Sequence, residues 1–194
     1  MKKVLIIIYS SYGHTLSLAK SIKIGIDSIG DIESTIYIVP ETLSDEVKSK
    51  MGVRDLEIPT IHALDPVFAQ ADGYLFGIPT RFGAMPAQLK AFFDSTGGLW
   101  KSKALSGKLV GLFISTGTQH GGIESTALNT ISFFAHHGLI YVPLGFSHAG
   151  LGTTSSVIGS SPYGAGCVGD VSDLDLDIAE SQGKQFAQTL LRFN

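Results

Sequence analysis

The sequence predicts a doubly wound α/β fold, a three-layer sandwich in which helices cover both faces of a five-stranded parallel sheet. The first observation is that short apolar runs alternate with longer amphipathic segments, which is typical of βαβ units. The second is that the first run, residues 3–9, is almost wholly apolar instead of alternating. A strand with this pattern is buried on both faces of its sheet.

The spacing of apolar residues predicts each element in order. Strands are expected at residues 3–9, 34–39, 71–78, 108–115 and 139–144. Apolar residues recur at helical spacing from Leu16 to Ile29, and Gly30 is a typical helix stop. Further helices are expected at residues 86–96, 123–137 and 176–193, with a short one near 66–71.

Two stretches interrupt this alternation. Residues 40–65 are polar and predict a surface excursion, whereas residues 145–173 are rich in Gly, Ser and Thr and have no period. Long loops of the second kind are usually functional or mobile. Because 194 residues is an ordinary size for one domain and no repeat is visible, we expect residues 1–194 to form a single domain.

Composition excludes two classes of partner. The chain has 14 Lys and Arg against 17 Asp and Glu, a net charge of −3, and no basic cluster, which argues against nucleic acid. The mean hydropathy is +0.26, but the longest aliphatic run, residues 4–8, is far shorter than the roughly 20 apolar residues that span a membrane. With one cysteine and no secretory signal, we expect a cytoplasmic protein whose apolar surplus reflects buried strands and subunit contacts.

Ligands of open α/β sheets bind beyond the carboxyl ends of the strands, so the residues after each strand carry the candidate site. The first strand is followed by Ser10, Ser11, Tyr12, Gly13, His14 and Thr15. Hydroxyl donors, a glycine that allows close approach and a helix N-terminus together suit a phosphate group. An ordinary helix cap needs only one such residue.

The segments after the third and fourth strands indicate a flat ligand. The third strand is followed by Pro79, Thr80, Arg81, Phe82 and Gly83. Guanidinium and aromatic groups both present flat faces to a planar ring, although this segment alone also fits a loop with a solvated arginine. The fourth strand is followed by Ser115, Thr116, Gly117, Thr118, Gln119, His120 and Gly121. We predict one pocket, with a phosphate at the first exit and a ring system between the other two.

Other motifs are discounted. Residues 164–169 match G-x-G-x-x-G, but they follow no predicted strand and open no helix, as the dinucleotide motif requires. The adjacent His136 and His137 lack the spacing of helical metal ligands, so we expect no metal site. Because their helix starts at the fourth exit, one of them could still reach the pocket. Cys167 is expected to be inert.

Seven segments in order along nearly the whole chain carry a family resemblance. They are residues 9–14 (YSSYGH), 39–42 (VPET), 77–83 (GIPTRFG), 96–100 (TGGLW), 115–118 (STGT), 135–138 (AHHG) and 161–165 (SPYGA). On these segments the chain resembles the WrbA family of flavodoxin-like NAD(P)H:quinone oxidoreductases. The resemblance implies a flavodoxin-like FMN-binding domain over residues 1–194, in which the stretches at 40–65 and 145–173 are family features.

The resemblance also implies a site. Residues 10–15 would hold the FMN phosphate, residues 79–83 would border the isoalloxazine, and residues 115–121 would complete its ring and ribityl side. Tyr12 would also contact the nicotinamide nucleotide, and Trp100 and His136 would shape the cavity above the ring, with His136 counted among the FMN-binding residues. NADH or NADPH and then a quinone would use this cavity in turn, passing two electrons through the flavin. No covalent catalytic residue is expected, and Arg81 and His136 are candidates for electrostatic or substrate-shaping roles.

The resemblance predicts a homo-oligomer, a dimer of dimers. One departure is that Gln119 and His120 stand where the family more often has an unbroken glycine run, so His120 is expected to alter flavin affinity or loop closure. Two alternatives stay open: an electron-transfer flavodoxin, and a non-catalytic FMN-binding scaffold or regulator. A net charge of −3 counts against a carrier that docks by charge. No residue can be assigned to choose between NADH and NADPH.

Overall fold

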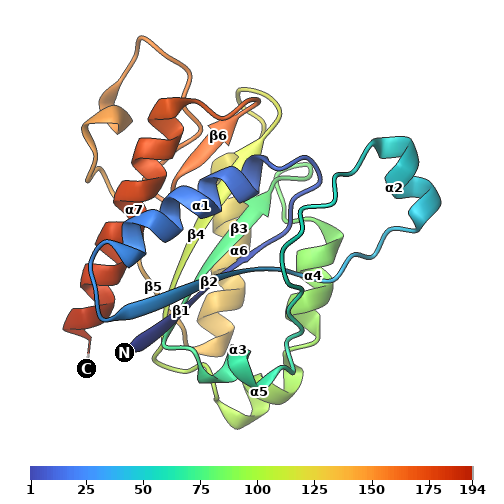
Figure 1. The fold of residues 1–194 in the computed structure, drawn as a ribbon, viewed down its shortest axis with the longest axis vertical. Coiled ribbons are helices and arrows are strands. Elements are labelled where there is room, and N and C mark those ends of the chain that lie inside the picture. Colours follow the sequence, from blue (N-terminus) through green and yellow to red (C-terminus); the bar gives the residue numbers. More distant parts are fainter. Residues whose placement is uncertain (194) are drawn as a thin grey trace.

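The computed structural model describes residues 1–193 and contains the predicted α/β sandwich (Figure 1). All strand pairs are parallel, and the order is β2-β1-β3-β4-β5, with β6 also paired to β4. The strands are β1 (Lys2–Ile8), β2 (Ile32–Ile38), β3 (Gly73–Pro79), β4 (Leu109–Thr116), β5 (Ile140–Tyr141) and β6 (Gly166–Val168). The helices are α1 (His14–Asp27), α2 (Asp45–Met51), α3 (Pro66–Gln70), α4 (Ala87–Asp94), α5 (Gly97–Ser102), α6 (Ile123–His137), the 3-10 helix η1 (Ala149–Gly152) and α7 (Asp173–Arg192). The predicted fold class is confirmed.

β1 divides the interior into two cores. Val4, Ile6 and Ile8 pack on the side of α1 and α7, whereas Leu5 and Ile7 pack on the side of α3, α4 and α6. All five side chains are at most 3% exposed. Burial on both faces explains why this run is apolar at every position rather than at alternate ones.

α1 and α7 cover one face of the sheet in close contact (Figure 1). A Cβ atom on Gly25 would lie 2.0 Å from the carbonyl oxygen of Glu180, and one on Gly183 would lie 2.1 Å from that of Ile22. Both distances are far below a normal contact. The two helices can therefore pack at this distance only because glycine occupies both positions.

The fifth strand position differs from the prediction. The strand expected at 139–144 is confined to β5, because the chain leaves the sheet after Val142, and the Gly145 N–H donates to the Pro162 carbonyl over 2.8 Å instead of to β4. The N–H of Val142 still donates to the Val110 carbonyl over 2.8 Å, and the chain then leaves for the long loop. It returns as β6, where Gly166 pairs with Ile114. β6 lies inside the discounted G-x-G-x-x-G segment, and its three residues are too few to show a strand pattern.

Two short helices were not predicted. α2 lies within the polar excursion and projects from the body of the molecule (Figure 1), capped by the Ser44 side chain, which accepts from the Val47 N–H over 3.4 Å. α5 begins with Gly97 and Gly98, and because glycine disfavours helices the sequence gives no sign of this one. Among residues 1–193, no helix is both long enough and apolar enough to cross a membrane.

Candidate functional site

The loops that follow β1, β3 and β4 meet at the carboxyl edge of the sheet. They enclose a cavity of about 160 Å³, which we call the edge cavity. The strand order reverses here between β1 and β3, which is where ligands of open α/β sheets bind. The edge cavity is lined by Ser10, Ser11, Tyr12, His14, Thr15, Pro79, Thr80, Arg81, Ser115, Thr116 and Gly117. The structure thus brings together residues from all three predicted strand exits.

The β1–α1 loop presents the start of α1 to the edge cavity. Gly13 occupies the N-cap position with a φ of 96°, in the left-handed region that favours glycine. Its N–H donates to Ser10 Oγ over 3.1 Å, and no side chain among residues 1–193 caps the first turn of α1. The N–H groups and dipole of a helix N-terminus attract anions. This geometry therefore suits a phosphate group.

Hydroxyl and backbone groups hold the three loops in register. Thr15 Oγ1 and Ser115 Oγ lie 3.0 Å apart and are both buried. The Thr80 N–H donates to the Ser115 carbonyl over 2.9 Å, and Thr80 Oγ1 lies 2.7 Å from Thr126 Oγ1. These bonds join the start of α1, the end of β4 and the loop after β3, so they set the width of the edge cavity.

The segment after β3 is a tight turn. Arg81 and Ala84 exchange both backbone hydrogen bonds, over 2.7 and 3.0 Å. The two central residues, Phe82 and Gly83, have φ values of 53° and 76°, as a type I′ turn requires. This conformation is strained for a bulky residue, and it leaves the Phe82 side chain fully exposed. Arg81 lines the edge cavity, where its Nη2 donates to Ser11 Oγ over 3.3 Å.

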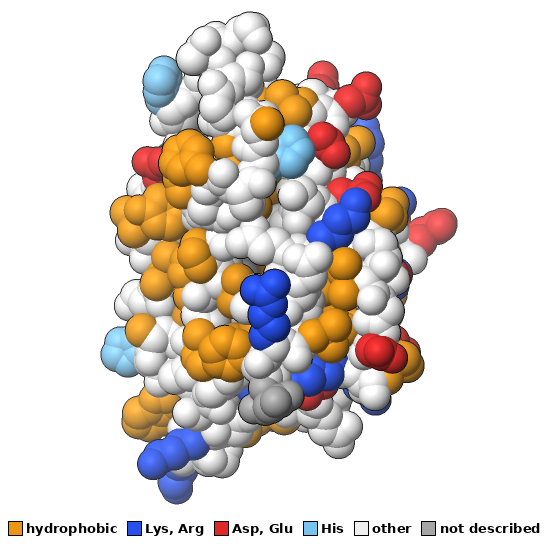
Figure 2. Space-filling model, turned by 90° about the vertical axis from the view of Figure 1, so that its left-hand side faces the viewer, with side chains coloured by type: hydrophobic (Ala, Val, Ile, Leu, Met, Phe, Trp, Pro, Cys, Tyr) orange, Lys and Arg blue, Asp and Glu red, His pale blue; other side chains and the backbone are white. Residues whose placement is uncertain are grey.

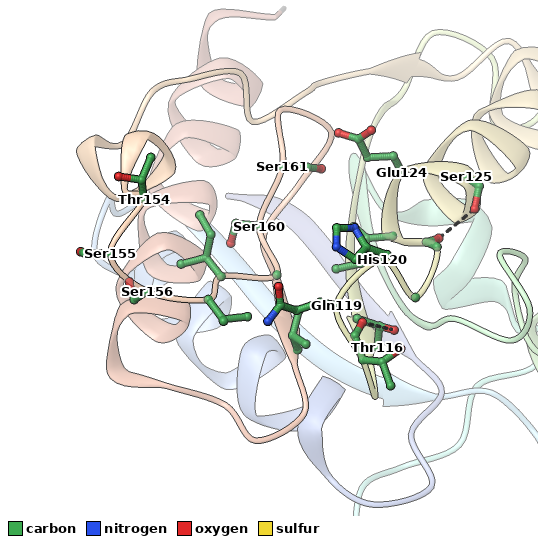
Figure 3. A pocket seen from close by; sticks show the side chains of 18 residues that line it. Thr116, Gln119, His120, Glu124, Ser125, Thr154, Ser155, Ser156, Ser160 and Ser161 are labelled. Atoms are coloured by element: carbon green, nitrogen blue, oxygen red, sulfur yellow. Dashed lines mark hydrogen bonds between the residues drawn. The ribbon is translucent and has the colours of Figure 1, made fainter.

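The β4–α6 loop also lines a second cavity of about 680 Å³, which we call the outer cavity (Figure 3). The outer cavity lies between this loop and residues 154–161. Figure 3 shows the Gln119 side chain on the side of the loop that faces Ser156 and Ser160. The residues predicted at the fourth exit are therefore divided. Residues 115–117 line the edge cavity, residues 118–121 line the outer cavity, and Thr116 lines both.

His120, the residue that departs from the family's glycine run, has a φ of 58°. An L-residue in the left-handed region costs roughly 1–2 kcal/mol, and a glycine would avoid this cost. The next residue, Gly121, cannot carry a side chain unless the loop moves, because a Cβ there would lie 2.0 Å from Thr116 Oγ1. The departure therefore falls on a position where the backbone conformation favours glycine.

Trp100 and His136 line neither cavity. His136 lies 13 residues after the start of α6 at Ile123, which places it about 20 Å along the helix axis at about 1.5 Å per residue. The start of α5 is at the same end of the molecule, because Thr96 Oγ1 lies 2.9 Å from His137 Nε2 (Figure 1). Neither His136 nor His137 lines the edge cavity of its own subunit, because α6 runs away from that cavity.

His137 and Cys167 are buried titratable groups outside the site. Nδ1 of His137 has no hydrogen-bond partner among residues 1–193. Burial lowers the pKa of its imidazole, and the charge of the neighbouring His136 lowers it further. Burial raises the pKa of the Cys167 thiol to about 12. A buried, protonated thiol is a poor nucleophile, as expected for an inert residue.

A polar network beside the β1–α1 loop escaped sequence reasoning. The Tyr9 hydroxyl donates to Glu41 Oε2 over 2.9 Å, and Gln88 Nε2 donates to Glu41 Oε1 over 2.7 Å. Burial raises the pKa of Glu41, but hydrogen bonds, including those from Gln88 and the Leu43 N–H, outweigh it and hold the pKa below its usual value. The network ties the segment after β2 to α4. The V-P-E-T motif includes Glu41, but no spacing in the sequence links it to Gln88.

Charge is dispersed over the face that carries α7 (Figure 2). Lys and Arg side chains stand apart from one another on this face, with apolar and acidic side chains between them. A nucleic-acid interface would need a continuous basic stripe. Nothing on the face shown in Figure 2 has that character.

Comparisons with known proteins identify relatives. Residues 3–153 match the family of NADPH-dependent FMN reductases. A probable NAD(P)H dehydrogenase (quinone) from Arabidopsis thaliana is 50% identical over 198 residues, which cover 98% of this chain and 72% of that protein. The quinone-oxidoreductase QR2 of Triphysaria versicolor is 49% identical, with 95% and 93% covered. The NAD(P)H quinone oxidoreductase PST1 of Candida albicans is 47% identical, with 98% of each chain covered.

Solved structures share the fold. The flavodoxin, WrbA-like protein of Agrobacterium tumefaciens has a TM-score of 0.71 over 100% of both chains at 20% identity. A flavodoxin from the domain Archaea has a TM-score of 0.62 over 97% of this chain and 99% of its own at 17% identity. At such identities the likeness concerns the fold, which is flavodoxin-like as the sequence predicts. The resemblance to WrbA-type quinone oxidoreductases is confirmed, and the chain belongs to the family of NADPH-dependent FMN reductases.

Proposed function

We propose that this chain is an FMN-dependent NAD(P)H:quinone oxidoreductase. The observation that carries the proposal is that the uncapped start of α1, the Arg81 turn and the end of β4 meet at one cavity at the switch point of the sheet. Relatives named as quinone oxidoreductases, similar over nearly the whole chain, support it. We further propose that residues 1–194 form one FMN-binding domain and that the protein is cytoplasmic.

The residues at the edge cavity fit FMN. The N–H groups at the start of α1, with the hydroxyls of Ser10, Ser11 and Thr15, would hold the phosphate. The ring would lie between the Arg81 turn and the end of β4, beside Thr116. When bound, FMN supplies the two-electron redox chemistry, and the protein supplies binding, orientation and electrostatics.

The turn after β3 contributes charge and backbone donors. Arg81 places a guanidinium at the cavity wall, where it would stabilise negative charge on the reduced cofactor. Its own N–H and that of Thr80 are already bonded to carbonyl groups. The N–H groups of Phe82 and Gly83 make no hydrogen bond to residues 1–193, so these two would donate to the ring. The mechanism needs no protein nucleophile.

A second copy of the chain would complete the cavity. Tyr12, at the rim, is 41% exposed, and Phe82 is fully exposed. Trp100, at the far end of the molecule, is 58% exposed, and His136, at the neighbouring end of α6, is also exposed. Exposed aromatic side chains are typical of interaction surfaces. We therefore infer that Trp100 and His136 of one subunit cover the edge cavity of another, in a homotetramer built as a dimer of dimers.

The activity is tested on protein reconstituted with FMN. The protein is mixed anaerobically with NADPH or NADH, and benzoquinone is then added while the flavin absorbance is followed. We expect the nucleotide to bleach the absorbance and the quinone to restore it. An electron-transfer carrier would need a protein partner for reduction, and a scaffold would show no turnover. Failure of both nucleotides to bleach the flavin would contradict the proposed function.

The shared cavity is tested by complementation. Trp100→Ala subunits are mixed with Arg81→Ala subunits, exchanged under mild denaturant and assayed. If a site uses Arg81 from one copy and Trp100 from another, mixed oligomers regain part of the activity that each variant lacks alone. Equal activity in mixed and unmixed samples would show that no site is shared. Sedimentation of the unmodified protein tests the tetramer.

A further inference from the structure

A third cavity, of about 410 Å³, adjoins the β1–α1 loop. It is walled by the end of β2 and by residues 40–60, the segment that carries α2 and that we call the arm; we call this hollow the arm cavity. Ser10 lines both the arm cavity and the edge cavity, so the β1–α1 loop is their common wall. Its volume lies within the range of about 300–1,000 Å³ that small-molecule sites occupy.

The arm is fastened to the β1–α1 loop at Arg54. The Arg54 N–H donates to the Ser11 carbonyl over 2.9 Å, and the Tyr12 hydroxyl donates to the Met51 carbonyl over 3.3 Å. The Arg54 guanidinium lies against the same loop, with Nη1 3.8 Å from the position that a Cβ on Gly13 would take. A cation from the arm therefore lies beside the loop that suits a phosphate, and Tyr12 reaches from that loop to the arm.

Among residues 1–193, no side chain pairs with the charge of Arg54, one of two cations that line the arm cavity. The other cation, Lys48, pairs with Asp45 over 2.7 Å. The Arg54 side chain makes no hydrogen bond or ion pair with any of residues 1–193, although it lines the cavity. A guanidinium offers a planar fork of N–H donors that matches two phosphate oxygens.

Four carboxylates also line the arm cavity, and one of them, Asp45, pairs with Lys48. Glu41 is occupied by Gln88 and by backbone N–H groups. Asp55 Oδ1 accepts the Glu57 N–H over 3.1 Å, and the Glu57 side chain is exposed. None of these carboxylates forms an ion pair with Arg54 in the part of the chain that the structure describes.

We propose that Arg54 is a specificity-determining residue that binds a phosphate group of the nicotinamide nucleotide. The inference rests on the proposed function, in which the nicotinamide lies over the flavin at the edge cavity. With FMN in the edge cavity, the rest of the dinucleotide must extend beyond that cavity, and the arm cavity lies on the other side of the loop that the two cavities share. Arg54 does not line the edge cavity, where the FMN phosphate is expected. The geometry therefore favours the nucleotide, and not FMN, as the molecule whose phosphate Arg54 binds.

The test is equilibrium binding of NADP⁺ and NAD⁺ to the FMN-loaded protein by calorimetry. Arg54→Gln removes the charge, Arg54→Lys keeps it without the fork, and Arg192→Gln removes an exposed arginine at the end of α7 as a matched control. We expect Arg54→Gln to weaken binding about tenfold or more, since a charged hydrogen bond contributes about 1.5–3 kcal/mol. Arg54→Lys should recover part of the loss, and Arg192→Gln should bind as the unmodified protein does.

Each outcome either shows which phosphate group Arg54 binds or overturns the inference. A loss confined to NADP⁺ assigns the 2′-phosphate to Arg54, and an equal loss for NADP⁺ and NAD⁺ assigns the pyrophosphate. Unchanged binding of both, or a loss of FMN alone, overturns the inference. Thermal denaturation of each variant verifies folding. Because the measurement needs no turnover, it decides the role of Arg54 even if neither nucleotide reduces the flavin and the proposed function fails.

Discussion

The hydroxyls of Thr15 and Ser115 lie 3.0 Å apart in the interior, although the two residues are 100 positions apart in the sequence. This pair ties the first turn of α1 to the end of β4. Since Ser115 also accepts the Thr80 N–H through its carbonyl, one residue sets the positions of all three loops around the edge cavity.

Replacing Thr15 by Val keeps the side-chain shape and removes the hydroxyl. Ser115 Oγ then loses its buried partner, and we expect a loss of about 1–3 kcal/mol in the free energy of unfolding together with weaker FMN binding. Urea denaturation and fluorescence titration measure the two effects. Thr189→Val, whose hydroxyl bonds to the Gln185 carbonyl within α7, is the control and should leave FMN affinity unchanged. Unaltered FMN affinity in Thr15→Val would contradict the positioning role.

Gly121→Ala should disrupt the β4–α6 loop. The added Cβ would lie 2.0 Å from Thr116 Oγ1 and 2.7 Å from the Thr118 carbonyl, so the loop must move. We expect FMN affinity to fall at least about tenfold, or 1.4 kcal/mol. Gly152→Ala, at the end of η1 and with nothing within 4 Å of its Cβ, should bind FMN normally. Equal affinities for the two variants would show that this loop does not hold the cofactor.

His120→Gly should stabilise the protein. The left-handed backbone of His120 costs roughly 1–2 kcal/mol, whereas the added freedom of glycine in the unfolded chain costs about 0.5–1 kcal/mol. We expect a net gain of up to about 1 kcal/mol in urea denaturation. Gln119→Gly, at a neighbouring position without a positive φ, should lose stability. A loss for His120→Gly as large as that for Gln119→Gly would show that the strain is absent.

Glu41 should make stability depend on acid pH. Its folded pKa lies below the usual value of 4.5 because hydrogen bonds outweigh its burial. The stabilisation is therefore fully present above about pH 4.5 and is lost as the pH falls through the lower, folded pKa. Glu41→Gln should lower the melting temperature at pH 7, and the gap to the unmodified protein should narrow below pH 4.5.

The control for Glu41 is Glu46→Gln, because Glu46 is exposed on α2 and, within residues 1–193, pairs only with Lys50 at the surface. Surface pairs of this kind contribute little, so its melting curve should follow that of the unmodified protein across the same pH range. A gap between Glu41→Gln and the unmodified protein that stays constant from pH 7 to pH 3 would contradict the assignment of the acid transition to Glu41.

Local patterns were sufficient for the elements that are long and buried. β1, β3 and β4 appear in the sequence as continuous apolar runs because both of their faces are covered. β6 was missed because three residues paired at a sheet edge leave no pattern, and α5 because its first residues, Gly97 and Gly98, are poor helix formers. Length and intrinsic propensity decided which elements could be predicted.

The sequence by itself determined the α/β class, the flavodoxin-like resemblance and the loops that meet at the carboxyl edge, because parallel strands joined through helices place their ends at one edge. Only the tertiary structure decided that Thr15 touches Ser115, that Arg54 lies against the β1–α1 loop, and that Thr96 Oγ1 lies 2.9 Å from His137 Nε2. These relationships depend on distances between residues far apart in the chain. No local spacing encodes such distances, because they are set by how the helices and loops pack on the sheet.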